Sequence, residues 1–159
     1  MAGRVTWTAD CRPLIDGSAE GVALVLDEPL SFWGGLNQAS GVIVDGHHPQ
    51  RGQNVSGMAL VMAAGRGSSS SSSVLAEAIR AGHGPSLICL TEPDEIVVLG
   101  ALVVQLLDEV TVPVVVAAAA DYRRIRTGDT VRLGPGGRLE VSSVSPGPAV
   151  PPRGTSPRT

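Results

Sequence analysis

The residues of this chain best suited to chemistry are the glycines, serines and single arginine of residues 64–73. An apolar run at 58–62 precedes them and predicts a buried strand, and the periodicity of residues 74–82 predicts an amphipathic helix. A turn from a strand into a helix N-terminus leaves backbone N–H groups unpaired at the positive end of the helix dipole. Such a turn can bind an anion or stabilise a serine alkoxide.

Ser68 is the sharpest candidate in this stretch. It is the first hydroxyl after the Gly-Arg-Gly triplet at 65–67, so we expect it to lie in the turn and not in the helix body. In a catalytic interpretation Ser68 is a general base or nucleophile, with Arg66 close enough to bind a substrate carboxylate or phosphate. In a structural interpretation it is a helix N-cap, a role that Ser69 or Ser70 could fill equally well. The residues alone leave these two interpretations balanced.

A run of six serines is also typical of a flexible linker. A linker here would divide the chain into parts of about 67 and 86 residues, and the first part lacks enough strands for a core of its own. The serines also abut the predicted strand and helix with no spacer. The context therefore favours an ordered loop.

Length and composition restrict the class of protein. The chain has 159 residues, 43% of them hydrophobic, which predicts one domain over residues 1–144 and a disordered tail rich in Pro, Gly and Ser over residues 145–159. A net charge of −3 argues against nucleic acid or an anionic membrane surface as a partner. All 12 basic residues are arginine, so lysine Schiff-base chemistry is excluded within this chain.

Two cysteines, Cys11 and Cys89, lie far apart in the sequence, and two thiolates alone cannot hold an iron–sulfur cluster. Cys89 lies in an apolar run and is expected to be an inert core residue. The N-terminus has no apolar segment typical of a signal peptide, and the longest apolar stretch, residues 96–107, is too short to span a bilayer. The expected location is the cytoplasm.

The hydrophobic pattern alternates between strands and helices, which predicts an α/β domain with extra hairpin strands at its end. A second helix opens at residues 92–94 and runs to about Asp108; it is apolar on nearly all sides and is expected to be buried or packed on a partner. A helical turn is expected at 121–126. The predicted strands are residues 22–26, 86–90, 112–116, 130–133 and 138–141, besides 58–62.

Residues 27–57 form a long connection, and connections of this length inside a compact domain are usually functional. They hold Phe32 and Trp33, which could fill the core; because aromatic residues are so few, we favour a role facing a ligand or a partner subunit. They also hold His47 and His48, whose side chains diverge on an extended backbone and so are poorly spaced to chelate one metal. A polar contact to substrate or partner is the expected role. His83 is expected in a surface turn.

Four motifs in order along the chain, residues 28–35, 47–49, 65–70 and 92–94, resemble the small subunit of aconitase X. The similarity spans about Arg4 to Leu133. It implies a swivelling β/β/α domain like the mobile fourth domain of aconitase. It also implies a separate large subunit, in a heterodimer or larger assembly, that carries an iron–sulfur cluster or iron, so that this chain binds no metal or cofactor itself and is inactive alone.

Members of that family are dehydratases, and the resemblance assigns Ser68 as the base that removes a proton while iron assists the departing hydroxyl. The implied substrate is a small hydroxy acid, with cis-3-hydroxy-L-proline preferred and 5-phosphomevalonate as the alternative. A further alternative is a non-catalytic swivelling carrier or interaction module, which would need a reactive histidine on the key loop. The expected substrate-binding or loop-supporting residues are Gly65, Arg66, Gly67, Ser69 and Ser70. The expected residues of the cleft or subunit interface are Phe32, Trp33, Gly34, Gly35, His47 and His48.

Overall fold

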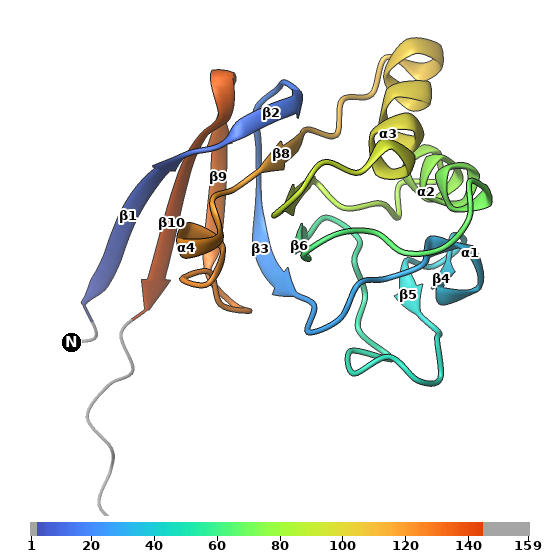
Figure 1. The fold of residues 1–159 in the computed structure, drawn as a ribbon, viewed down its shortest axis with the longest axis horizontal. Coiled ribbons are helices and arrows are strands. Elements are labelled where there is room, and N and C mark those ends of the chain that lie inside the picture. Colours follow the sequence, from blue (N-terminus) through green and yellow to red (C-terminus); the bar gives the residue numbers. More distant parts are fainter. Residues whose placement is uncertain (1–2, 145–159) are drawn as a thin grey trace, which may run out of the picture.

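The computed structural model describes residues 3–144, so the predicted tail and its boundary with the domain lie outside the described residues. The chain forms one curled sheet of eight strands in the order β1-β10-β9-β3-β6-β7-β8-β2, with its longer helices gathered on one side (Figure 1). The strands are β1 (Arg4–Asp10), β2 (Arg12–Ile15), β3 (Ala19–Val25), β6 (Ala59–Val61), β7 (Leu87–Leu90), β8 (Val114–Val116), β9 (Thr130–Gly134) and β10 (Arg138–Val144). The other elements are α1 (Phe32–Gly35), β4 (Leu36–Asn37), β5 (Val42–Ile43), α2 (Ser70–Arg80), α3 (Glu95–Asp108), α4 (Ala119–Tyr122) and the 3₁₀ turn η1 (Pro135–Gly137).

The centre of the sheet is parallel. Strands β3, β6, β7 and β8 all run in one direction, whereas β1, β2, β9 and β10 pair antiparallel to their neighbours. Helix α2 returns the chain from β6 to β7, and α3 returns it from β7 to β8, as parallel pairing requires. The two helices lie side by side (Figure 1). The carboxyl ends of β3, β6 and β7 therefore meet at one edge of the sheet.

The central strands are buried on both faces, so alternate residues enter two different cores. One core lies between the sheet and α2 and α3, and the other is enclosed where β1, β9 and β10 curl behind the sheet. Every residue of β7 is buried. Leu60, Ile88 and Leu90 enter the first core, and Ala59, Val61, Leu87 and Cys89 enter the second.

The α/β prediction is confirmed, and a strand lies within or across each predicted apolar run. Two predictions were wrong at the N-terminal side of an element. Helix α2 begins at Ser70 and not at Val74, so the last serines of the run belong to its first turn. Strand β3 begins at Ala19, three residues before the predicted strand 22–26, and the strands β1 and β2 before it were not predicted. Gly82 ends α2 as predicted, with φ +79° and a bond from the His83 N–H to the Ala78 carbonyl.

Helix α3 is covered on one face only in this chain, so it is not fully buried here, and the alternative expectation, packing on a partner, stays a prediction. Val97, Gly100, Ala101 and Val104 are buried against α2 and the sheet. The leucines at positions 99, 106 and 107 are exposed by 47%, 72% and 70%, so an apolar face of α3 is open to solvent in this chain. Across residues 3–144, the helices all fall short of the length and apolarity that crossing a membrane requires.

Replacing Gly100 by Ala tests the close contact between α2 and α3. A Cβ at position 100 would lie 2.8 Å from the Ser72 carbonyl oxygen and 3.0 Å from Leu75 Cδ2. Overpacking costs about 1–3 kcal/mol, which outweighs the roughly 1 kcal/mol that alanine gains over glycine in a helix. We expect urea titration to report a lower free energy of unfolding for Gly100→Ala. Gly134→Ala is the control, because the nearest atom to its Cβ lies 3.8 Å away; equal stability of the two variants would contradict the prediction.

Candidate active site at the carboxyl edge of the sheet

Three connections meet where the parallel strands end. The chain leaving β3 passes through Leu30, the chain leaving β6 passes through Gly65, and these two residues form a parallel bridge. The Arg66 N–H donates to the Leu30 carbonyl at 3.2 Å. The chain leaving β7 brings Asp94, whose Oδ2 accepts the Gly65 N–H at 2.8 Å. Sites in open α/β sheets are typically built from such loops.

Ser68 lies in the turn between β6 and α2, as predicted, and its side chain is exposed. Its carbonyl accepts the Ser71 N–H at 3.0 Å, which starts the first turn of the helix. Ser69 occupies the N-cap position, with helical φ and ψ and no capping bond from its side chain. The N-cap interpretation of Ser68 is therefore wrong, and the Ser68 hydroxyl makes no hydrogen bond to another described residue.

Backbone donors without partners lie next to Ser68 in the chain. Within residues 3–144, the N–H groups of Gly67, Ser68, Ser69 and Ser70 make no hydrogen bond to another protein group. They lie at the N-terminal end of α2, where the helix dipole adds positive potential. The turn is therefore built to receive an anion or a developing oxyanion beside Ser68.

Gly67 is required at its position in this turn. Its φ of +103° favours glycine, and a Cβ there would overlap the Ser31 hydroxyl oxygen. The loop is therefore packed directly on Ser31, which precedes α1.

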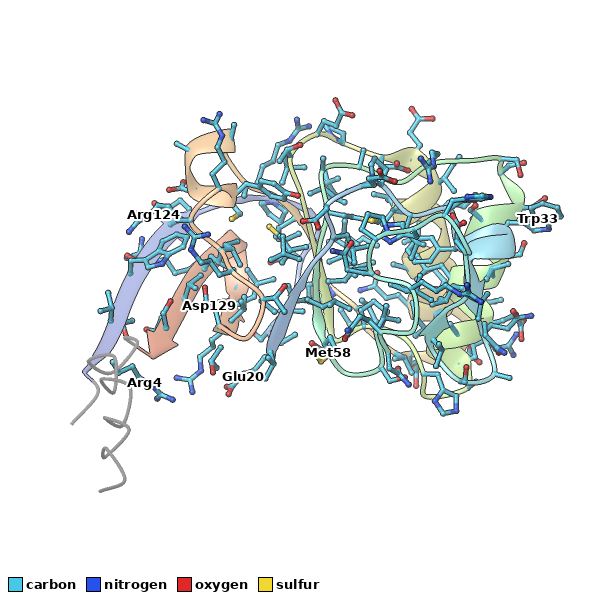
Figure 2. All side chains as sticks on the ribbon, turned by 90° about the horizontal axis from the view of Figure 1, so that it is seen from below. Arg4, Glu20, Trp33, Met58, Arg124 and Asp129 are labelled. Carbon is cyan, nitrogen blue, oxygen red and sulfur yellow. The ribbon has the colours of Figure 1, made fainter. Side chains whose placement is uncertain are left out.

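A closed ring of hydrogen bonds joins α1 to the start of α2. The Trp33 N–H donates to Ser71 Oγ at 3.2 Å, the Ser71 hydroxyl lies 3.3 Å from Ser31 Oγ, and Ser31 Oγ donates to the Trp33 carbonyl at 3.0 Å. Because Ser31 donates to the carbonyl, Ser71 must donate to Ser31. Ser71 is 1% exposed, so the two bonds that it makes are partly buried, whereas the bond from Ser31 to the Trp33 carbonyl is exposed. The Trp33 side chain itself is 62% exposed and points away from the molecule at its outer end (Figure 2).

Arg66 brings positive charge to the turn, and Asp45 partly neutralises it. The Arg66 guanidinium lies 3.8 Å from Asp45 Oδ2, and about half of the Arg66 side chain is exposed. Asp45 Oδ1 accepts the His47 N–H at 2.9 Å. The 45–49 segment thus contacts the serine turn, with His47 exposed beside it.

Two predictions for the long connection were wrong. Phe32 is 1% exposed and is part of the core beneath α2, so it faces neither ligand nor solvent. His48 is 4% exposed: its Nδ1 accepts the Gln50 N–H at 3.1 Å, which leaves Nε2 to donate to the Glu28 carbonyl at 3.0 Å. Both ring nitrogens are used, and neither can contact a substrate or a partner. Gly35 is likewise buried, whereas Trp33, Gly34 and His47 are exposed, and their role in a cleft or subunit interface stays a prediction.

Three residues of the site, Ser31, Ser71 and Asp94, were not assigned a role in it from the sequence, whereas Asp45 belongs to the 45–49 segment that was expected to line the cleft or the subunit interface. Ser71 belonged to the serine run but gave no sign of its ring partner 40 residues away. Asp94 was expected only at the start of a helix. That expectation is confirmed, since Asp94 Oδ1 accepts the Ile96 and Val97 N–H groups at 3.0 Å each.

The cysteines lie away from the serine turn. Cys11 and Cys89 are both buried in the core behind the sheet. A hydrogen bond with Cys11, together with burial, holds the pKa of the Cys89 thiol well above its ordinary value. No group of three or more His, Cys, Asp or Glu side chains suited to a metal ion occurs among residues 3–144. The described residues therefore do not fit an iron–sulfur cluster.

Two surface hollows lie outside the turn. The larger, about 550 Å³, lies over β3, β9 and β10 and is lined by ion-paired Glu20, Arg132 and Glu140. The smaller, about 350 Å³, lies beside Asp94 and is lined by apolar residues of α3. Neither includes Ser68, which lies on an open surface.

The fold and the turn define a class of protein: an α/β domain with an exposed serine and unpaired backbone N–H groups at the carboxyl edge of its parallel sheet. A family model described as the aconitase X swivel domain matches residues 8–141. The chain belongs to this family, which confirms the predicted swivelling fold.

Similar proteins carry dehydratase names. The chain is 39% identical to a cis-3-hydroxy-L-proline dehydratase of Pseudomonas aeruginosa, over 86% of this chain and 23% of that protein. It is 34% identical to a phosphomevalonate dehydratase small subunit of Methanopyrus kandleri, over 82% of this chain and 95% of that subunit. A crystal structure of Thermococcus kodakaraensis aconitase X in its holo-form has a TM-score of 0.76, with 29% identity over 85% of this chain and 98% of that chain. The chain thus spans about a quarter of the first relative and nearly all of the second.

Ser71→Ala tests the ring beside the serine turn. The substitution removes the acceptor of the Trp33 N–H, and a buried donor left unpaired costs about 1–3 kcal/mol. We expect a lower free energy of unfolding in urea than for Ser73→Ala, a control in the same helix whose side chain is exposed. Both variants gain the same helix propensity, so their difference isolates the ring. Equal free energies of unfolding for the two variants would contradict a stabilising role of the ring.

Thiol labelling tests the environment of Cys89. Because the thiolate is the reactive form, a thiol whose pKa is raised should not react with a disulfide reagent at pH 8 while the chain is folded. A Cys11→Ser chain leaves Cys89 as the sole thiol and removes its hydrogen bond with Cys11, so this variant tests the part of the pKa increase that burial causes. We expect no labelling of this folded chain and complete labelling after unfolding in urea; rapid labelling of the folded chain would overturn the assignment.

Proposed function

We propose that this chain is the small, swivelling subunit of an aconitase X-type dehydratase, and that Ser68 is its catalytic base. The observation that carries the proposal is the exposed Ser68 in a turn at the N-terminal end of α2, where neither its hydroxyl nor the N–H groups of residues 67–70 bond to another group among residues 3–144. Membership of the aconitase X swivel family and the dehydratase names of its relatives support the reaction class.

Dehydration of a hydroxy acid needs a base that removes a proton from the carbon next to the one that bears the hydroxyl. The base takes the proton, the C–H electron pair becomes the new double bond, and the hydroxyl leaves as water after gaining a proton. Ser68 would act as the alkoxide, which the N–H groups of residues 67–70 and the start of α2 stabilise. Arg66 lies on the same turn and would bind the substrate carboxylate.

The substrate we favour is cis-3-hydroxy-L-proline. The relative with that activity in its name is 39% identical, against 34% for a phosphomevalonate dehydratase small subunit. The charge of the turn adds physical support. Because Asp45 already pairs with Arg66, the turn has little net positive charge, which suits a carboxylate better than a phosphate ester. 5-Phosphomevalonate remains the alternative substrate.

We infer that the partner is an aconitase X large subunit and that any iron–sulfur or iron centre resides there. The buried cysteines and the lack of a metal-binding group among the described residues support a centre outside this chain. The open apolar face of α3 supports association with another protein. The chain alone would then lack the group that assists departure of the hydroxyl, and we expect it to be inactive in the cytoplasm without its partner.

A carrier or interaction module is the competing function from another class. A phosphohistidine carrier needs an exposed histidine on the turn, and the turn offers serine instead. His48, the one buried histidine, has both ring nitrogens engaged. These observations favour the dehydratase.

The decisive assay joins this chain to its candidate large subunit by co-expression and offers the two substrates separately. Turnover of cis-3-hydroxy-L-proline by the pair, and by neither chain alone, is the expected result. Turnover of 5-phosphomevalonate instead would reassign Arg66 and the free N–H groups to phosphate binding. Phosphate incorporated on His47 without dehydratase activity would favour the carrier.

Ser68→Ala tests the base within that assembly. Loss of a general base typically costs about 10²–10⁴-fold in rate, so we expect kcat to fall by that factor. Size-exclusion chromatography should show the assembly intact, because the Ser68 side chain makes no contact that holds the fold. Ser73→Ala, on the exposed side of α2, should keep wild-type activity. A near-wild-type kcat in Ser68→Ala would remove Ser68 from the mechanism.

A further inference from the structure

The carboxylate of Asp94 connects two elements that the chain brings together from different strands. Its Oδ1 caps α3 through the Ile96 and Val97 N–H groups, while its Oδ2 accepts the Gly65 N–H at 2.8 Å. We infer that Asp94 is a positioning residue for Ser68, which fixes the serine turn relative to α3. The inference rests on the proposed catalytic role of Ser68.

The geometry at Gly65 leaves the turn little freedom. A Cβ at this position would lie 2.8 Å from Asp94 Oδ2 and 3.1 Å from Val97 Cγ2, so the backbone packs directly on the carboxylate and on α3. On its other side, the adjoining Arg66 N–H is held by the Leu30 carbonyl. The chain is thus fixed from both sides at the point where it enters the turn.

The position of Ser68 depends on its backbone, because the Ser68 side chain has no protein partner among the described residues. Between Gly65 and Ser68 the chain passes only Arg66 and Gly67, so a displacement at Gly65 is passed on over three residues. The Asp94 carboxylate already accepts three N–H groups and is partly buried beneath the turn. These contacts fit a supporting role and not proton transfer to substrate.

Asp94→Asn separates the two functions of the carboxylate. An amide has one acceptor oxygen, so when that oxygen keeps the α3 cap the NH₂ group faces the Gly65 N–H, donor against donor. Asparagine caps helices as well as aspartate does, so α3 should be preserved. Asp94→Ser is the second variant, because serine also caps a helix but is too short to reach Gly65.

Asp129→Asn is the matched control. Asp129 is a buried aspartate that, like Asp94, accepts a backbone N–H, from Arg126 at 2.8 Å, and it lies in the half of the molecule away from Trp33 (Figure 2). The substitution therefore repeats the chemical change at a distance from the serine turn.

In the assembly with the large subunit, we expect both Asp94 variants to lower kcat by about 10- to 100-fold, as small displacements of catalytic groups do, with KM changed by less than about threefold. In the full small chain, amide exchange at Gly65 followed by NMR should become faster in both Asp94 variants. Asp129→Asn should change neither quantity.

The outcomes separate this inference from the proposed function. A wild-type kcat in both Asp94 variants, with Ser68→Ala inactive, overturns the role of Asp94 alone. An equal loss of kcat in Asp129→Asn also overturns it, since the effect would then be general destabilisation. Full activity of Ser68→Ala overturns the proposed base and the positioning role with it.

Discussion

The structure depends on how backbone groups are paired where the parallel strands end. At that edge the chain can no longer use the sheet for hydrogen bonding, and every buried N–H and carbonyl needs another partner. The Leu30 carbonyl and the Asp94 carboxylate supply partners for Arg66 and Gly65. Pairing then stops at residues 67–70, where the backbone donors are left free. At the site, the protein leaves four successive backbone donors without partners among residues 3–144.

The two cores behind this edge provide its rigidity. With only 3% aromatic residues, the chain fills both cores chiefly with aliphatic side chains from the central strands. Because β7 is buried on both faces, its register relative to β6 is fixed. The positions at which the loops after β6 and β7 begin are therefore fixed as well. Phe32, the largest residue in the first core, fixes the connection that leaves β3 by packing into that core. Its neighbour Trp33 points outward (Figure 2). The burial of Phe32 and the hydrogen bonds of the Trp33 backbone to Ser31 and Ser71 together hold the backbone in the conformation that directs the Trp33 side chain away from the core.

The sequence allowed prediction of the features that arise from local patterns. The apolar runs revealed the central strands, and the Gly-Arg-Gly triplet placed Ser68 in a turn. Strand β1 was missed because its residues are mostly exposed and its partner, β10, lies about 130 residues further along the chain. Asp94 and Ser31 were missed in the site for the same reason, because each acquires its role only through tertiary contact. His48 was misjudged because two backbone contacts, invisible in sequence, use both ring nitrogens.

An open site of this kind has a physical consequence for how it would work. Ser68 and its free N–H groups lie on an exposed surface, where water competes for every hydrogen bond and weakens electrostatic stabilisation. A serine alkoxide is not sustainable under those conditions. On the proposed function, closure of the large subunit over the turn would remove that water and strengthen the same donors without altering them. The pairing of Arg66 with Asp45 would limit the charge buried in that closure. On that proposal, the isolated chain would hold a base that acts only once the large subunit covers it.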